Sequence, residues 1–481
     1  MNMLDFNDFL NIEGRECNTF SDRQIVCIQG LGFVGSAMAV ATSIAKDEDG
    51  NSYFNVIGVD LDNKQGMDRI DSINRGEFPF STDDDLLKNS TKDSHLQQNL
   101  VATSNVEAYS IADIIIVDIH LDIDFHDDKP LLDFSNLEKG LETIAKSIQK
   151  GALIIIETTV PPGTCEKIVI PKMEKELLKR GLELNDIFIA HSYERVMPGE
   201  NYLDSIINFW RVFSGMNEES ADRCESFLSK VINTDEFPLT RLSSMTASET
   251  AKVLENSYRA ANIAFMDEWT KYAELVGVNL IEVIDSIKKR PTHNNIMYPG
   301  LGVGGYCLTK DPSFAPAATE QLFGFHGQKF PFLDITKKVN RSMPDHAFDH
   351  TMRALEGSIS GKKILICGVA YRQNVGDTRF SPSEYYARKC ISNDAVVDYF
   401  DPHVIFWEEM QMESQTLPLD FSSYHLVLFA VKHNEFLNLD YEDLKINQSL
   451  TIIDTANILD KKKIKSICSN LIRIGDGDKS E

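Results

Sequence analysis

The sequence predicts an α/β protein in which two doubly wound parallel sheets are joined by a central helical domain with a long helix. Three observations predict this fold. Short apolar runs alternate with helix-like stretches up to about residue 215, strand signals then stop until about residue 345, and the alternation finally resumes. Continuous apolar strands between amphipathic helices are typical of a parallel sheet that is covered on both faces.

The expected strands of the first sheet are the runs 24–29, 55–60, 113–119, 152–158 and 186–192, and those of the second are 362–370, 396–401, 425–431 and 451–456. Residues 248–276 contain neither Gly nor Pro, which predicts a helix longer than an ordinary globular one and able to link two domains. We therefore expect an N-terminal extension (1–22), a first Rossmann-like domain (23–215), a central helical domain (216–345) and a second Rossmann-like domain (346–481).

The composition is that of a globular protein: 481 residues, of which 42% are hydrophobic and 25% charged. A formal net charge of −25 would repel nucleic-acid phosphates and anionic lipid, so we expect no nucleic-acid partner and no membrane partner. The eight cysteines form no Cys-x-x-Cys pair, which argues against a disulfide framework or zinc site, and we expect no metal. Neither a signal peptide nor a membrane-spanning stretch is visible, so the expected location is the cytoplasm.

A dinucleotide-binding motif follows the first expected strand and opens a helix. It consists of Gly30, Leu31, Gly32, Phe33, Val34 and Gly35. The three glycines of such a motif make a tight turn, let the backbone approach a pyrophosphate, and pack helix on strand. Asp60 ends the next strand, where its carboxylate would bind the ribose hydroxyls of NAD and repel the 2′-phosphate of NADP. NAD is therefore the expected cofactor, with FAD as the rival.

A glycine-rich loop with a cysteine is the most unusual stretch of the chain. It runs from Pro299 to Pro312 and places Cys307 directly after four glycines, of which the last two are Gly304 and Gly305. Glycines allow the backbone to approach a ligand closely. A lysine and an aspartate follow within four residues, a setting that can hold a reactive thiolate. We interpret the other seven cysteines as structural.

The motifs taken together resemble the UDP-glucose/GDP-mannose dehydrogenase family over about residues 24–460. The resemblance rests on GLGFVG near the start, ETTVPPGT at 157–164, YERVMPG at 193–199, KVLEN at 252–256, GGYCLTKD at 304–311 and GDTRFSPS at 376–383. It implies an enzyme of polysaccharide biosynthesis that oxidises the C6 alcohol of a nucleotide sugar twice, with two NAD per product. Cys307 would capture the aldehyde as a thiohemiacetal, and water would hydrolyse the resulting thioester to a uronic acid.

The resemblance also implies roles for residues around the cysteine. Lys252 and Asn256, four apart and so on one helix face, would stabilise the oxyanion, although such a pair is otherwise an ordinary solvated face. Three further residues would orient water or act as the base of hydrolysis: Asp311, Thr159 and Glu194. Alone, Glu194 beside Arg195 could form a surface ion pair, and Thr159 could simply end a strand. Lys310 matches a lysine of the UDP-glucose branch, and a solvated lysine is an equal interpretation.

The second Rossmann-like domain has one glycine, Gly368, where a dinucleotide motif needs three, so we expect it to bind no NAD. The resemblance assigns it the nucleotide half of a UDP-sugar, with Arg372 and Arg379 as phosphate or ribose contacts. Arg290 resembles an arginine that reaches the substrate of a neighbouring subunit, which would require a homodimer or higher homo-oligomer. Its alternative interpretation is a basic helix end favoured by the helix dipole.

The identity of the sugar and the class of protein have ranked alternatives. Pro198 favours a UDP-N-acetylhexosamine, whereas Lys310 favours UDP-glucose, and GDP-mannose is the third candidate. His120 stands where the family has a threonine-proline pair; a hydrogen-bonded strand end is favoured over a pocket-facing position. A two-electron dehydrogenase with a structural Cys307 and a non-catalytic protein that binds nucleotide sugars are the competing functions.

Overall fold

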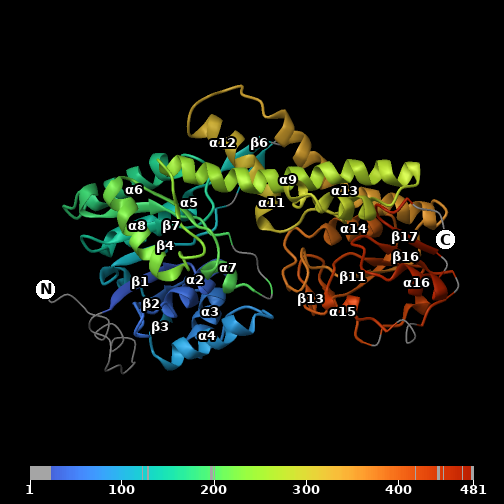
Figure 1. Ribbon diagram of the computed structural model, residues 1–481, viewed down its shortest axis with the longest axis horizontal. Helices are drawn as coiled ribbons and strands as arrows, with labels where there is room; N and C mark the ends of the chain where they lie inside the picture. The colour runs from blue at the N-terminus through green and yellow to red at the C-terminus, as the bar shows by residue number, and fades with distance from the viewer. Residues whose placement is uncertain are drawn as a thin grey trace. The chain divides into compact units, whose positions relative to one another are not determined.

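A computed structural model of the chain describes residues 23–477, apart from 122, 127–128, 196–198, 200, 418, 441–444, 448 and 469. It divides the chain into two compact units. The first unit takes in the chain up to Leu254 together with Ser313–Gln328, and the second takes in Glu255–Pro312 and Lys329–Glu481. Each unit contains one large sheet (Figure 1).

The sheet of the first unit has eight strands in the order β10-β9-β8-β7-β4-β1-β2-β3. All neighbours are parallel except β8 and β9. The strands are β1 (Gln24–Gln29), β2 (Phe54–Val59), β3 (Leu100–Thr103), β4 (Ile114–Val117), β7 (Leu153–Ile156), β8 (Phe188–His191), β9 (Val212–Gly215) and β10 (Thr240–Arg241). A separate hairpin joins β5 (Ile123–His126) to β6 (Lys129–Leu132).

Helices cover both faces of this sheet. One face packs against α2 (Phe33–Ser43), α3 (Lys64–Asn74), α4 (Asp85–Leu96) and α8 (Glu218–Val231). The other face packs against α5 (Ser135–Ser147) and α6 (Ile170–Leu178). The unit also contains α7 (Asp204–Ile207) and α12 (Phe314–Gln321). Apolar side chains fill both layers, which is why the central strands read as continuous hydrophobic runs.

The carboxyl ends of five strands form one row. In the parallel register Gln29 pairs with Val59 and Val117, Val117 pairs with Ile156, and Ile156 pairs with His191. The loops that leave these strands therefore emerge along the same edge of the sheet. Open α/β sheets bind their ligands outside this edge, which makes it the place to look for a site.

The sheet of the second unit has five parallel strands in the order β12-β11-β15-β16-β17. They are β11 (Lys363–Cys367), β12 (Val396–Phe400), β15 (Leu426–Phe429), β16 (Thr451–Asp454) and β17 (Asn470–Arg473). One face packs against α13 (Pro331–Ala354) and α14 (Pro382–Ile391), and the other against α15 (Asn434–Leu437) and α16 (Lys461–Ile467). A short hairpin joins β13 (Phe406–Trp407) to β14 (Met412–Glu413).

The long helix α9 (Met245–Val276) begins in the first unit and continues into the second (Figure 1). It ends at Gly277, whose φ of 83° is the left-handed conformation typical of a helix C-terminus. Downstream lie α10 (Leu280–Lys288), a 3-10 turn at Pro291–His293, the short α11 (Tyr306–Lys310) and a 3-10 turn at Asp311–Ser313. The uninterrupted α9 follows from the absence of Gly and Pro over residues 248–276.

The predicted fold class is confirmed, because strands lie in all nine expected runs and, along the chain, a long helix separates the strands of the first sheet from those of the second. Four strands of the two sheets were not expected: β3, β9, β10 and β17. Of these, β10 lies in the stretch between about residues 215 and 345, where the sequence predicts no strand. The division of the chain into four segments stays a prediction, and the extension 1–22 lies outside the described residues.

Candidate active site

The glycine motif forms a turn that only glycine fits. Gly30 has a φ of 94°, and a Cβ on it would lie 2.6 Å from the carbonyl oxygen of Asp118. A Cβ on Gly35 would overlap the carbonyl oxygen of Gly30. Helix α2 begins at Phe33, and its N-cap Gly32 has no side chain to cap the first N–H groups. This arrangement fits the pyrophosphate of a dinucleotide, which such N–H groups bind.

Asp60 lies beside this turn at the end of β2. Its Oδ2 accepts a hydrogen bond from the Leu31 amide at 3.2 Å, and its Oδ1 accepts one from the Leu61 amide at 2.7 Å. Arg69 on α3 donates to Oδ2 at 3.1 Å. These contacts hold the carboxylate next to the glycine turn, the position that a ribose-binding acid requires.

His120 follows β4 at the same edge of the sheet. Its side chain is exposed, and its Nε2 lies 3.7 Å from where a Cβ on Gly32 would be. The ring therefore lies next to the glycine turn, and its role stays a prediction.

Two carboxyls with buried oxygen atoms, those of Asp118 and Glu157, lie at the same edge of the sheet. Asp118 follows β4 and Glu157 follows β7, and Arg211 forms a buried ion pair with Glu157. Burial, reinforced by the neighbouring Glu157, raises the pKa of Asp118, so this carboxyl favours its protonated form. One arginine and two carboxyls thus form a compact polar network in an otherwise apolar layer.

Thr159 lies in the loop that leaves β7, and a buried glutamate from α9 holds the next part of that loop. Glu249 accepts hydrogen bonds from the amides of Gly163 at 2.5 Å and Cys165 at 2.7 Å. Burial raises the pKa of Glu249 to about 7. The carboxyl therefore ties the first turns of α9 to the loop that carries Thr159.

Glu194 and Lys252 form an ion pair, also in the first unit. The Lys252 Nζ lies 3.0 Å from the Glu194 Oε2 and donates to its carbonyl oxygen at 2.6 Å. The expected alternative, an ion pair between Glu194 and Arg195, does not appear among the described ion pairs; Arg195 donates to the Tyr193 hydroxyl at 3.1 Å. Burial and the Lys252 cation lower the pKa of His191 to about 3, so that ring is neutral.

Asn256, Asp311 and Lys310 form a second cluster, in the second unit. The Asn256 Nδ2 donates to the Asp311 Oδ2 at 2.6 Å, and the Lys310 Nζ donates to the Asp311 Oδ1 at 2.8 Å. Asp311 is fully buried and Lys310 nearly so, with the ammonium 4.6 Å from the centre of the Tyr306 ring. The structure thus does not support the interpretation of Lys310 as a solvated lysine.

Cys307 lies on α11, directly after the glycine loop, and its side chain is exposed, whereas the other cysteines of the described part are buried. A Cβ on Gly304 would lie 2.8 Å from the Cβ of Tyr371, and one on Gly305 would lie 2.7 Å from the Tyr371 ring. The Gly305 amide donates to the carbonyl oxygen of Arg379 at 3.1 Å. The glycines therefore let this loop pack closely against the segment that follows β11.

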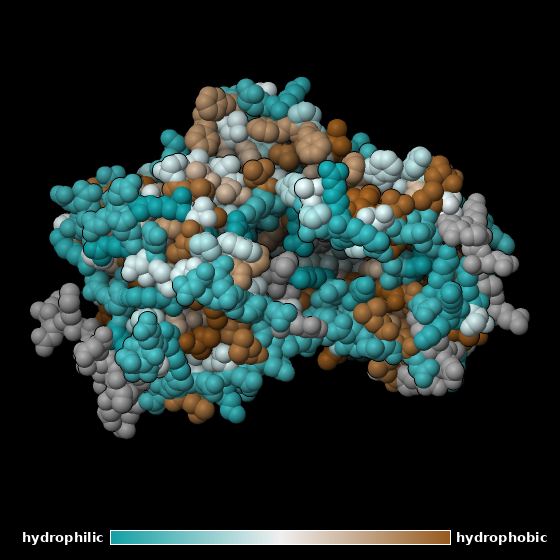
Figure 2. Space-filling model, viewed as in Figure 1, coloured by the Kyte–Doolittle hydropathy of each residue, from teal (hydrophilic) through white to brown (hydrophobic). Residues whose placement is uncertain are grey.

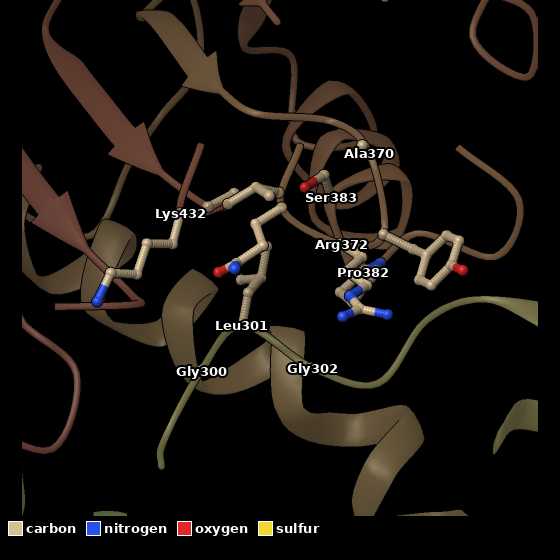
Figure 3. A pocket seen from close by; sticks show the side chains of 12 residues that line it. Gly300, Leu301, Gly302, Ala370, Arg372, Pro382, Ser383 and Lys432 are labelled. Carbon is tan, nitrogen blue, oxygen red and sulfur yellow. The ribbon is translucent and has the colours of Figure 1, made fainter. Parts of the chain in front are cut away.

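A cavity of about 370 Å³ lies between the start of the glycine loop and the carboxyl ends of β11 and β15 (Figure 3). Residues 300–302, 370–373, 382–383 and 430–432 line it. In Figure 3 the lining residues Lys432 and Arg372 lie on opposite sides of the view. Burial lowers the pKa of Arg372, and the nearby Arg259 of α9 lowers it further. Clustered cations at a cavity favour an anionic ligand.

Two residues with predicted roles lie apart from this cavity. Arg379 does not line it and instead pairs with Asp377, its Nη2 lying 2.6 Å from Oδ2. Arg290 is exposed just after α10, as N-cap of the following 3-10 turn. Pro198, used to rank the sugars, lies outside the described residues.

Several residues of the site were missed in the sequence. Arg259 follows Lys252 and Asn256 at positions i+7 and i+3, so the helical period could have placed it on the same face. Lys432 follows the expected strand 425–431, at the end where ligands bind. The contact of Glu249 with the loop after β7 could not be predicted from the sequence. Acidic residues are common near the start of a helix because they interact favourably with the helix dipole.

Three successive parts of the chain match models of one family: residues 24–232 match the NAD-binding domain of the UDP-glucose/GDP-mannose dehydrogenase family, 246–342 its central domain and 365–461 its UDP-binding domain. A UDP-N-acetyl-D-mannosamine dehydrogenase of Methanocaldococcus jannaschii is 29% identical over 456 residues, 94% of this chain and 96% of that protein. A UDP-N-acetyl-D-glucosamine 6-dehydrogenase of Pseudomonas aeruginosa is 28% identical, over 91% of this chain and 98% of that protein.

A solved structure of UDP-D-ManNAc dehydrogenase from Pyrococcus horikoshii is similar throughout, with a TM-score of 0.80, 27% identity, and coverage of 95% of this chain and 100% of that one. No helix within the described residues is long and apolar enough to cross a membrane. The matched NAD-binding and UDP-binding domains agree with the two sites derived above. The chain belongs to the UDP-glucose/GDP-mannose dehydrogenase family, whose members are NAD-dependent oxidoreductases that act on nucleotide sugars.

Proposed function

We propose that this enzyme oxidises the C6 alcohol of a UDP-N-acetylhexosamine to the uronic acid, in a four-electron reaction that passes through Cys307. The observation that carries the proposal is the exposed Cys307 thiol at the end of a glycine loop, next in the chain to the buried Lys310–Asp311–Asn256 cluster. A structural cysteine would need neither exposure nor a loop of four glycines, since buried packing is the usual role of a free cysteine.

The chemistry balances with two hydride transfers and one hydrolysis. NAD supplies the acceptor for both hydrides. The alcohol loses a hydride and a proton to become an aldehyde, and the Cys307 sulfur adds to that carbonyl to give a thiohemiacetal. Loss of a second hydride and proton leaves a thioester, and water then breaks the carbon–sulfur bond to release the acid and restore the thiol.

Lys252 and Glu194 suit the proton and charge transfers of these steps. An ammonium held next to the reacting carbon stabilises an oxyanion as it develops. The carboxylate of Glu194 can take a proton from the water that attacks the thioester. The 3.0 Å ion pair between the two residues keeps both groups oriented before substrate binds. Thr159 and His120 extend the same edge of the sheet, where they would contact the water and the cofactor.

Asn256 and Asp311 suit the orientation of the oxyanion and of a water. The Asn256 amide keeps one N–H for the oxyanion while the other donates to Asp311 at 2.6 Å. Asp311 is fully buried, and a buried carboxylate requires a nearby cation to compensate its charge. The Lys310 ammonium is that cation.

The cavity of the second unit suits the nucleotide. Its opposed Arg372 and Lys432, together with Arg259, would bind the diphosphate, since guanidinium groups bind phosphate oxygens in pairs. Gly304 and Gly305 would let the loop backbone follow the sugar. Arg379 would contact the nucleotide only after leaving Asp377, so we assign it a secondary role.

The stoichiometry of the reaction tests the mechanism. We expect two NADH for each acid formed, and Cys307→Ser should lower acid formation by at least about 10³-fold. Cys468→Ser is the matched control, because a serine hydroxyl can keep the hydrogen bond to the Leu450 carbonyl. One NADH per turnover with near-normal activity of Cys307→Ser would show a two-electron dehydrogenase. Binding of NAD and UDP-sugar without any absorbance change at ~340 nm would show a non-catalytic protein.

A substrate panel tests the sugar. The named relatives act on UDP-N-acetylmannosamine and UDP-N-acetylglucosamine by their names, which supports an N-acetylated sugar. We expect the highest kcat/KM with one of the UDP-N-acetylhexosamines, measured as NADH production against UDP-glucose and GDP-mannose. Preference for UDP-glucose by tenfold or more would replace the first assignment with the second.

We also propose that the enzyme is a homodimer that buries one stripe of α9. Teal, hydrophilic residues cover much of the face shown in Figure 2, yet α9 exposes a row of large apolar side chains. The row consists of Tyr258, Phe265, Trp269, Tyr272 and Val276, each at least 45% exposed. The spacings of seven, four, three and four residues put them on one helix face, and such a stripe can pack against a second copy around a twofold axis.

Sedimentation of the purified enzyme tests the dimer. We expect a dimer for the wild type and a monomer for Trp269→Asp combined with Tyr272→Asp. A matched change on another exposed helix, Leu178→Asp, should leave the dimer intact. Loss of activity on Arg290→Ala, with the dimer retained, would support the role of Arg290 at the substrate of the neighbouring subunit. A monomeric wild type would overturn the assembly without affecting the chemistry.

A further inference from the structure

We propose that the second unit carries a site for a divalent transition metal of the zinc type, formed by Glu274, His346 and His350. The three residues come from two helices: Glu274 lies near the end of α9, and the two histidines lie one turn apart on α13. The site is independent of the nucleotide cavity, and none of its residues belongs to the proposed active site. The cysteines gave no reason to expect a metal, and the ligands here are histidines.

The ligand atoms converge. The Nε2 of His346 and the Nε2 of His350 each lie 2.8 Å from the Oε2 of Glu274. The three atoms all lie within 4.8 Å of one another. Two histidines at i and i+4 on one helix face, completed by a carboxylate from elsewhere, match the His₂Glu set that binds Zn²⁺ at about 2.0–2.2 Å and leaves a position for water. Small side-chain rotations would admit an ion between these atoms.

The second oxygen of the carboxylate is already held. The Gly475 amide donates to the Oε1 of Glu274 at 2.8 Å, which leaves Oε2 turned toward the histidines. Metal-binding carboxylates usually have such a hydrogen bond, since it fixes their orientation. Burial opposes ionisation, but the hydrogen bonds from His346, His350 and Gly475 lower the pKa of Glu274 to about 2. The Gly475 contact thus sets the orientation of the carboxylate independently of the two histidines.

The three side chains are 13–15% exposed, which is enough for an ion to enter and for water to complete the coordination.

A hydrogen-bonded clamp is the competing explanation, in which both imidazoles simply donate to one oxygen. A metal would instead tie α9, α13 and the segment around Gly475 together through coordination bonds, and such bonds stabilise a fold far more than surface hydrogen bonds do.

Metal titration of the chelator-treated enzyme distinguishes the two explanations. We expect one Co²⁺ per chain with a Kd in the micromolar range or tighter, seen as a visible absorption band of tetrahedral Co²⁺. Zn²⁺ should displace it and raise the Tm of the second unit by several degrees. His346→Gln and His350→Gln should each weaken binding at least tenfold. A glutamine amide can still donate to Glu274, so these variants lose the ligand and keep the clamp.

Two controls locate the ion. His326→Gln removes an exposed histidine of the first unit and should bind Co²⁺ like the wild type. NADH production should be unchanged in His346→Gln and His350→Gln, which shows that they fold. The proposal is overturned if the wild type binds no Co²⁺ at ~100 μM, if the glutamine variants bind as tightly as the wild type, or if the spectrum shows a thiolate charge-transfer band that disappears in Cys307→Ser.

Discussion

Replacing Glu249 with glutamine should change how the stability of the first unit depends on pH. Glu249 is fully buried and accepts two backbone hydrogen bonds, and burial raises its pKa from 4.5 to about 7. Because the folded protein holds a proton that the unfolded chain releases above pH 4.5, stability is lost as the pH rises from about 4.5 through 7. The loss amounts to about 3 kcal/mol, since each tenfold change in proton affinity corresponds to about 1.4 kcal/mol.

Glutamine carries no titratable proton, so Glu249→Gln lacks this loss. About 2.5 kcal/mol of this loss falls between pH 5 and pH 8, so the Tm of the variant relative to the wild type should rise by about 5–10 °C between these pH values, at about 2–4 °C per kcal/mol for a unit of this size. Scanning calorimetry at both pH values measures this change in relative Tm. The loss of a hydrogen bond in the variant lowers its Tm equally at both pH values and therefore cancels in the comparison. Glu174→Gln, on the exposed side of α6, controls for the change in net charge.

A Tm difference between Glu249→Gln and the wild type that is the same at pH 5 and pH 8 would refute the reasoning. It would mean that the two backbone amides compensate the buried charge completely and that Glu249 is ionised throughout. The same change in relative Tm between pH 5 and pH 8 for Glu174→Gln and for Glu249→Gln would have the same meaning.

Two further variants test the glycine turn and the oxyanion cluster. Gly35→Ala would force a Cβ into the Gly30 carbonyl oxygen and should weaken NAD binding by at least tenfold in calorimetric titration, whereas Gly300→Ala, whose Cβ would meet nothing, should bind NAD normally. Asn256→Asp would set a second carboxylate 2.6 Å from Asp311 and should lower kcat by about 10²–10³-fold with a smaller effect on KM, measured as NADH production; an unchanged kcat would remove this amide from the mechanism.

The fold was predictable where the chain forms central strands. Strands β1, β4, β7 and β8 lie between neighbours on both sides and under helices on both faces, so their residues are almost all apolar. The strands that escaped prediction are short or lie near an edge. β10 has two exposed residues, and β17 is only partly buried at the edge of its sheet. Edge strands carry a weaker apolar pattern because one side meets solvent or a loop.

The site was predictable where local spacing encodes it. The glycine turn, Asp60 and the loop before Cys307 are each set by neighbours in the chain: α2 begins within the glycine motif, Asp60 directly follows β2, and Cys307 lies on α11 after the loop. The buried network of Asp118, Glu157 and Arg211 could not be predicted. Its members are separated by tens of residues, and a polar residue in a strand–loop junction reads as an ordinary turn position until the packing around it is known.

The helix α9 shows the same limit at the centre of the proposed mechanism. The four-residue spacing predicts that Lys252 and Asn256 share a face, but it says nothing of their partners. Lys252 pairs with Glu194, 58 residues before it, while Asn256 donates to Asp311, 55 residues after it. Two carboxylates from opposite directions along the chain thus meet neighbouring turns of one helix. Because α9 contains neither Gly nor Pro over residues 248–276, both contacts lie on one uninterrupted helix.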